Sequence, residues 1–145
     1  MQRIAVLALV ALALPSAAGS QTTYPVNPGY WEVKEKWLGL ISRTERWCVE
    51  PKNITKFVAA PCNHIYHCTY PVQQMSDGKI YFEGEWRGHD ELYKVKGRGS
   101  YTSTTLIINV SGSGHWHIVP VPGASASLKG AFLSADCPAD AKHFG

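Results

Sequence analysis

The segment Lys79–Arg87 alternates apolar and polar residues with a period of two, the pattern of a strand with one buried face. Ile80, Phe82 and Trp86 fall on one side, and charged residues dominate the other. The Ser-Asp-Gly turn signal at 76–78 comes directly before it, so we expect a hairpin with the preceding segment. A chain with this segment at its centre must build an antiparallel sheet over a one-sided core.

Further strands are expected at regular intervals around this hairpin. They cover about residues 30–38, 42–49, 92–96, 101–110, 115–119 and 125–134, and stretches rich in Gly, Pro and Ser at 97–99, 111–114 and 120–123 separate the later ones. One short helix is expected after Pro51. The sequence therefore predicts an all-β fold of about seven or eight strands, either a small antiparallel meander barrel or a sandwich.

The N-terminus shows the order of features of a secretory signal peptide. Arg3 precedes the uncharged apolar run Ile4–Leu14, and small residues follow it. Cleavage after Ala18 or after Ser20 satisfies the small-x-small rule. The run is too short to cross a bilayer core of about 30 Å, although an uncleaved N-terminal anchor is the alternative. We expect residues 1–20 to be removed during export.

The remainder is expected to form one domain over residues 21–138 with a loose tail over residues 139–145. Lys and Arg number 14 against 11 Asp and Glu, too even a balance for a nucleic-acid-binding surface. No later segment is long and apolar enough to cross a membrane. We expect a periplasmic or secreted monomer.

Four cysteines, an even number in an exported chain, indicate two disulfides. Four cysteines allow three connectivities. Proximity favours Cys62–Cys68, and elimination then leaves Cys48–Cys137.

Several short motifs together carry a resemblance. They are Pro-Gly-Tyr-Trp-Glu at 28–32, Cys-Val-Glu-Pro at 48–51, the hairpin from Cys68 to Trp86, and the stretch from Gly130 to Pro138. Over about residues 28–138 the chain resembles the exported bacterial family filed as domain of unknown function 3617. That family usually has a second cysteine near the position of Trp86, and Cys62 looks like its replacement, which supports the same pairing. The resemblance implies export and a small disulfide-bonded β fold, and it implies no reaction.

Two pairs of histidines are candidate metal ligands. His64 and His67 lie between Cys62 and Cys68, while His115 and His117 share one face of a predicted strand. Imidazole suits copper and zinc, but disulfide sulfur is a poor ligand and the spacing matches no zinc motif. Exposed histidines are therefore the simpler interpretation, and a copper or zinc site is an alternative.

Five tryptophans are many for a chain of this length, and most are expected in the core. A small barrel lined by aromatic side chains can instead hold one apolar ligand. The candidate ligand-binding residues are Trp31, Glu35, Trp37 and Trp86, with Glu35 as a carboxylate on an otherwise apolar strand face.

No catalytic signature is present, and Gly112-Ser113-Gly114 lacks the spacing of a nucleophile elbow. We therefore expect no enzyme and no cofactor. The leading hypothesis is a binding or accessory module of the cell envelope whose partner is a small apolar ligand or an envelope protein. A histidine-based metal-binding protein and an enzyme of unrecognised type are the alternatives.

Overall fold

The computed structural model describes residues 23–59, 61–62 and 65–145, so the predicted signal peptide lies outside the described residues. The elements in chain order are β1 (Gly29–Trp37), β2 (Ile41–Val49), the 3-10 turn η1 (Pro51–Asn53), α1 (Ile54–Ala59), β3 (His67–Ser76), β4 (Lys79–Arg87), β5 (Glu91–Tyr101), β6 (Thr105–Trp116), β7 (Val119–Ser134) and β8 (Lys142–His143).

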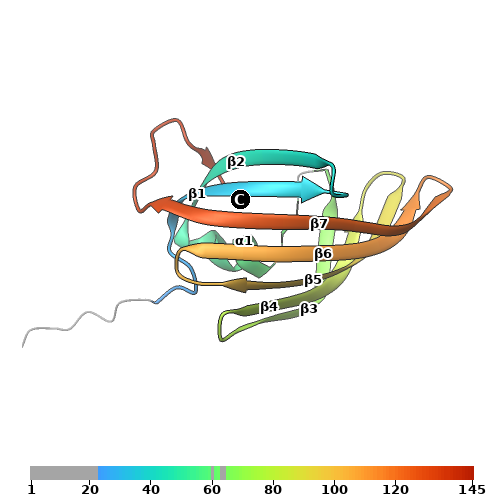
Figure 1. The fold of residues 1–145 in the computed structure, drawn as a ribbon, viewed down its shortest axis with the longest axis horizontal. Coiled ribbons are helices and arrows are strands. Elements are labelled where there is room, and N and C mark those ends of the chain that lie inside the picture. The colour runs from blue at the N-terminus through green and yellow to red at the C-terminus, as the bar shows by residue number, and fades with distance from the viewer. Residues whose placement is uncertain (1–22, 60, 63–64) are drawn as a thin grey trace, which may run out of the picture.

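The strands form a single sheet in the order β3-β4-β5-β6-β7-β1-β2-β8. Neighbours pair antiparallel, except that the short β8 runs parallel to β2. The chain makes a meander from β3 to β7, and β7 then pairs with β1, so the first hairpin extends the sheet (Figure 1). The all-β prediction with one short helix is confirmed, and the sheet is open rather than closed as a barrel.

The core lies between α1 and the face of the sheet that curls toward it, which we call the concave face. Trp31 is fully buried there, and its ring meets Phe57 of α1 at 5.4 Å and Phe132 of β7 at 5.6 Å between centroids. The other core residues from the sheet and helix are Val33, Val49, Ile54, Val58, Ala59, Ile80, Phe82, Leu106 and Ile108, with Val26 from the segment before β1. Burial of this apolar set is what holds the helix against the sheet.

Three predicted breaks are wrong, because residues 97–99, 111–114 and 120–123 lie inside β5, β6 and β7. A Cβ at Gly97 would overlap the ring of Phe82 on the neighbouring strand, so this glycine makes room for a core aromatic and does not mark a turn. Pro120 and Pro122 lie where β7 has no partner on its β1 side, since pairing with β1 begins at Ala126. Proline is tolerated in such an edge segment.

The β6–β7 turn is tighter than predicted. Trp116 pairs with Val119, so the loop between them has two residues, His117 and Ile118. His117 takes a positive φ of 54°, which two-residue hairpin loops require and which glycine or asparagine usually supplies. The predicted strand over 115–119 is therefore wrong.

Two disulfides join Cys48 to Cys137 and Cys62 to Cys68, the pairing that proximity and elimination favoured. The first connects β2 to the segment after β7, and the second closes the loop before β3.

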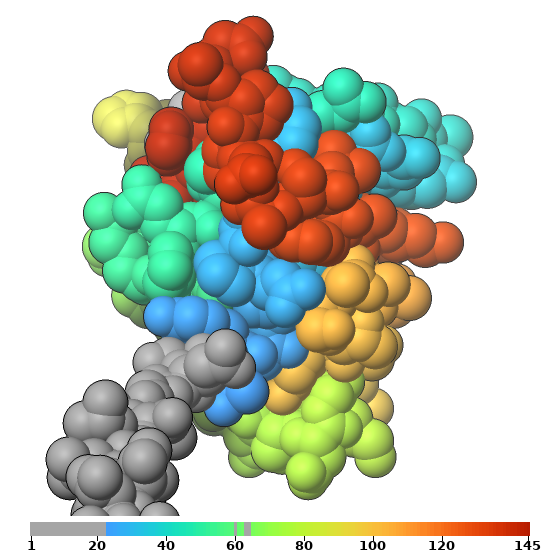
Figure 2. Space-filling view, turned by 90° about the vertical axis from the view of Figure 1, so that its left-hand side faces the viewer, coloured from blue at the N-terminus to red at the C-terminus, as the bar shows by residue number. Residues whose placement is uncertain are grey.

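Residues 139–145 were expected to be a loose tail, and the structure packs them instead. Phe144 lies against Phe57 at 5.2 Å and Trp47 at 6.1 Å between ring centroids, and its carbonyl accepts a 2.6 Å hydrogen bond from Asn53 Nδ2. Figure 2 shows the C-terminal residues, in red, on the same side of the molecule as the green residues of η1 and α1. The aromatic side chain of Phe144, together with the nearby disulfide, holds the tail in place.

Candidate functional site

A second cluster of aromatic side chains lies on the concave face, outside the core around α1. Trp37 at the end of β1 meets Trp86 of β4 with ring centroids 6.0 Å apart. Tyr66, from the loop before β3, stacks on Trp86 at 6.0 Å and meets Tyr93 of β5 edge-on at 6.1 Å. We call these four residues the aromatic cluster.

The cluster is anchored on its inner side and accessible on its outer side. Trp86 is buried, and its Nε1 donates a 2.7 Å hydrogen bond to the hydroxyl oxygen of Tyr70, which in turn donates to the carbonyl of Pro61. Burial raises the pKa of Tyr70 to about 12, so its hydroxyl stays protonated as a donor. Trp37 is half-buried, so one side of its indole faces solvent.

Polar side chains border the cluster on β1 and β2. Trp37 Nε1 donates a 3.3 Å hydrogen bond to Oε2 of Glu35, which lies two residues away on the same face. Arg43 lies directly opposite Glu35 in the register of β1 and β2, and its guanidinium forms an ion pair of 2.5 Å with Glu45. The site thus offers aromatic surface beside a carboxylate and a guanidinium, an arrangement suited to an amphipathic molecule.

On the other side of the cluster, Glu91 lies close to Tyr66. Burial, followed by this neighbouring carboxylate, raises the pKa of Tyr66, and the same two causes in the same order raise the pKa of Tyr93. Both phenols are therefore neutral at physiological pH and act as apolar surface with a polar tip.

Of the four candidate ligand-binding residues, the structure brings Glu35, Trp37 and Trp86 together. It places Trp31 elsewhere, fully buried in the core with its Nε1 bonded to the carbonyl of Asn27 at 2.9 Å. Sequence reasoning missed Tyr66 and Tyr93. The alternation of Tyr93 with Val95 in β5 could have placed Tyr93 on the inner face, but no sequence signal places Tyr66 beside it.

The candidate metal ligands do not converge among the described residues. His64 lies outside them, and His67 is exposed at the start of β3. His115 and His117 do not share a strand face, because β6 ends at Trp116; Nδ1 of His115 lies 3.0 Å from the carbonyl oxygen of His117. Nδ1 of His117 instead faces Asp90 Oδ2 at 3.4 Å. Within the described part of the chain, no three His, Cys, Asp or Glu side chains gather to hold a metal ion.

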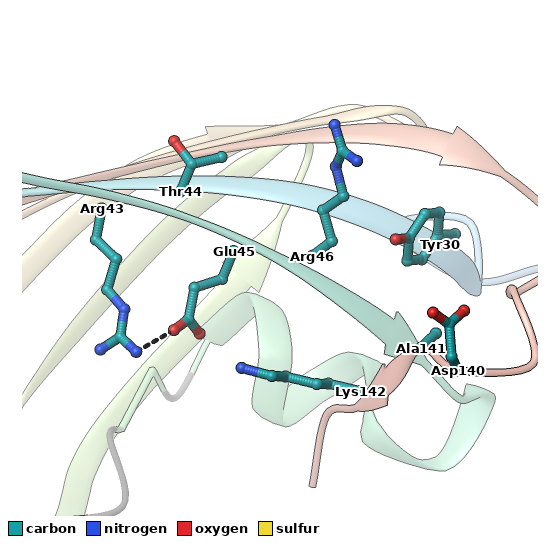
Figure 3. A pocket seen from close by; sticks show the side chains of 8 residues that line it. All are labelled: Tyr30, Arg43, Thr44, Glu45, Arg46, Asp140, Ala141 and Lys142. Carbon is teal, nitrogen blue, oxygen red and sulfur yellow. Dashed lines mark ion pairs between the residues drawn. The ribbon is translucent and has the colours of Figure 1, made fainter.

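The structure also has two hollows that are lined by other residues. One, of about 450 Å³, follows the outer edge of β2 beside β8, with the Arg43–Glu45 ion pair at one end and Asp140 at the other, and Lys142 between them (Figure 3). The other, of about 570 Å³, lies on the convex face of the sheet between Lys36 and the pair Lys96 and Arg98. Neither hollow is lined by a residue of the aromatic cluster.

Comparison with protein-family models, curated proteins and solved structures found no match to this chain. Across residues 23–59, 61–62 and 65–145, no helix has the length and apolar character needed to cross a membrane.

Proposed function

We propose that this chain is an exported binding module of the cell envelope that takes a small amphipathic ligand at the aromatic cluster. The ligand's apolar chain lies against Trp37 and the rings behind it, and its polar head lies toward Glu35 and Arg43. No catalytic step is part of the proposal.

The observation that carries this proposal is the placement of the aromatic cluster. Four large aromatic side chains from three strands and one loop gather on the concave face beside the core around α1, to which Trp86 is connected through Tyr70 and Phe82. Three of them, Trp37, Tyr66 and Tyr93, are only half-buried. Partly exposed aromatic rings with a few polar groups at their edge are the usual lining of a site for a small apolar ligand.

Three features support export. The N-terminal residues have the secretory pattern, the chain resembles an exported family, and both disulfides need an oxidising compartment to persist. The Cys48–Cys137 disulfide also ties the C-terminal residues to β2.

Calorimetric titration of lauric acid into the chain beginning at Gln21 tests the ligand site, since this chain retains every described residue. We expect saturable binding that Trp37→Ala weakens by about tenfold or more, because the substitution removes the accessible indole surface. Ile107→Ala is the matched control, since Ile107 is an exposed apolar residue on the convex face of β6. Absence of binding, or equal loss in both variants, would overturn the proposal.

A further inference from the structure

Two hairpin turns at one end of the sheet expose large apolar side chains. Leu40 is 87% exposed and Ile118 is 95% exposed, well beyond the other apolar residues of the described chain. Leu38, Ile41, Trp116 and Val119 flank them and are each more than half exposed. We call these six residues the open-end tips.

Strand pairing places both turns at the same end of the molecule. β1 ends at Trp37, which pairs with Ala126 of β7, and β7 begins further out at Val119. The β1–β2 turn and the β6–β7 turn therefore project in the same direction, to the right in Figure 1. The Trp37 end of the aromatic cluster lies at the base of the first turn.

We propose that the open-end tips insert into the interfacial layer of a lipid bilayer and dock this end of the protein on a membrane surface. This goes beyond the small ligand proposed above and does not depend on it. Large apolar side chains that a fold leaves exposed at its surface are candidates for an interaction site.

The tips carry little that would resist entry into an apolar layer. The turn from Leu38 to Ile41 contains no charged residue, and His117 is the one ionisable side chain in the other turn. Buried backbone groups must be paired in lipid. Here the N–H of Leu38 donates to Ser125 at 2.8 Å, that of Leu40 to Trp37 at 3.0 Å, and that of His117 to Asp90 at 2.8 Å.

The distribution of side chains favours a lipid surface over a protein partner. The tips stand on two separate hairpins, so a fluid layer can accept each one without a complementary rigid surface. Trp116 lies beside His117 with ring centroids 5.4 Å apart, and tryptophan is enriched at the level of lipid headgroups. Behind the tips, Arg43 is paired with Glu45 and Asp90 lies close to His117, while Lys36, Lys96 and Arg98 line the hollow that includes Gly39 of the first turn. Docking by apolar insertion predicts binding that does not depend on these charges.

Vesicle flotation tests the proposal with the chain beginning at Gln21. Vesicles of phosphatidylcholine alone, and of phosphatidylcholine with phosphatidylglycerol, are mixed with the protein at low and at high salt. We expect binding to both kinds of vesicle that persists at high salt. For the double variant Leu40→Ser, Ile118→Ser, we expect the partition coefficient to fall by about tenfold or more.

The matched control is Ile107→Ser with Leu133→Ser, which removes two exposed apolar side chains from other parts of the sheet and should bind as the unaltered chain does. Absence of binding, binding only to anionic vesicles at low salt, or equal binding by the tip variant would overturn the proposal. Sedimentation velocity without lipid completes the test. A dimer that dissociates in the tip variant would show that a second copy covers the tips, and this too would overturn it. Lauric acid titration of the same variants separates this outcome from failure of the ligand site.

Discussion

The indole rings of Trp37 and Trp86 lie with centroids 6.0 Å apart and planes inclined by 60°, although three strands separate β1 from β4 in the sheet. The contact therefore spans the concave face and does not follow the hydrogen-bonded ladder. It requires the sheet to curl until its two halves meet, and it lies outside the core around α1. This pair links the curvature of the sheet to the proposed ligand site.

The Trp37–Trp86 contact should appear as an energetic coupling. We predict about 0.5–1.5 kcal/mol from a double-mutant cycle with Trp37→Leu and Trp86→Leu, measured by chemical unfolding, because edge-on aromatic pairs contribute this much beyond their burial. A control cycle of Trp37→Leu with Trp47→Leu should give additive changes within about 0.5 kcal/mol, since Trp47 packs on Phe144 instead. Additivity in both cycles would show that the rings do not interact.

The two disulfides should differ in their effect on stability. The Cys48–Cys137 connection spans 89 residues and the Cys62–Cys68 connection spans 6, so the first removes more entropy from the unfolded chain. Replacing Cys48 and Cys137 by alanine should lower the free energy of unfolding by about 4–5 kcal/mol. Replacing Cys62 and Cys68 by alanine should lower it by about 2 kcal/mol. Denaturant titration checks the order, and a larger loss for the short loop would contradict it.

Gly97 should tolerate no side chain while Phe82 keeps its position. Gly97→Ala forces a Cβ into the Phe82 ring and should lower the free energy of unfolding by about 1–3 kcal/mol. The double variant with Phe82→Leu should recover part of that cost, because the smaller side chain frees the space. Gly123→Ala, where nothing lies within 4 Å, is the matched control and should change stability by less than about 0.5 kcal/mol. Equal effects of the two alanines would show that the packing at Gly97 is wrong.

Alkaline pH should destabilise the fold partly through Tyr70. Its folded-state pKa, raised to about 12 by burial, exceeds the ordinary value of about 10, so the unfolded chain loses this proton first. The stabilisation is complete below pH 10 and is lost as pH rises toward 12, by roughly 1 kcal/mol between pH 9 and pH 11. Chemical unfolding across this range should show a shallower decline for Tyr70→Phe. Parallel curves for the two proteins would mean that Tyr70 is not buried as described.

Much of the fold could be predicted from local pattern. The alternation over Lys79–Arg87 correctly identified β4 and its turn, because a half-buried strand imposes a period of two on the sequence. Gly97 misled the prediction, since its role is set by the Phe82 ring on a neighbouring strand. The β6–β7 turn was misplaced because His117 adopts a positive φ without the usual glycine signal.

The candidate site was only partly predictable for the same reason. Glu35 and Trp37 share a strand face by their spacing, so the sequence could place them together. The contact of Trp37 with Trp86 depends on sheet curvature, and that of Tyr66 with Tyr93 depends on a loop, and neither has a local signature. Trp31 and Trp37 lie on the same face of β1 by their alternation in the sequence. However, α1 covers Trp31 and leaves Trp37 half-buried.

Indole NMR tests the proposed ligand site most directly, because the five tryptophans sample different parts of the molecule. Lauric acid is titrated into the ¹⁵N-labelled chain beginning at Gln21 while the indole N–H resonances are followed. We expect saturable shifts of the Trp37 and Trp86 resonances at one common affinity. The resonances of Trp31 and Trp47, which pack against Phe57 and Phe144, should not move. Saturable shifts of Trp31 or Trp47 without Trp37, or no shift at any indole, would contradict it.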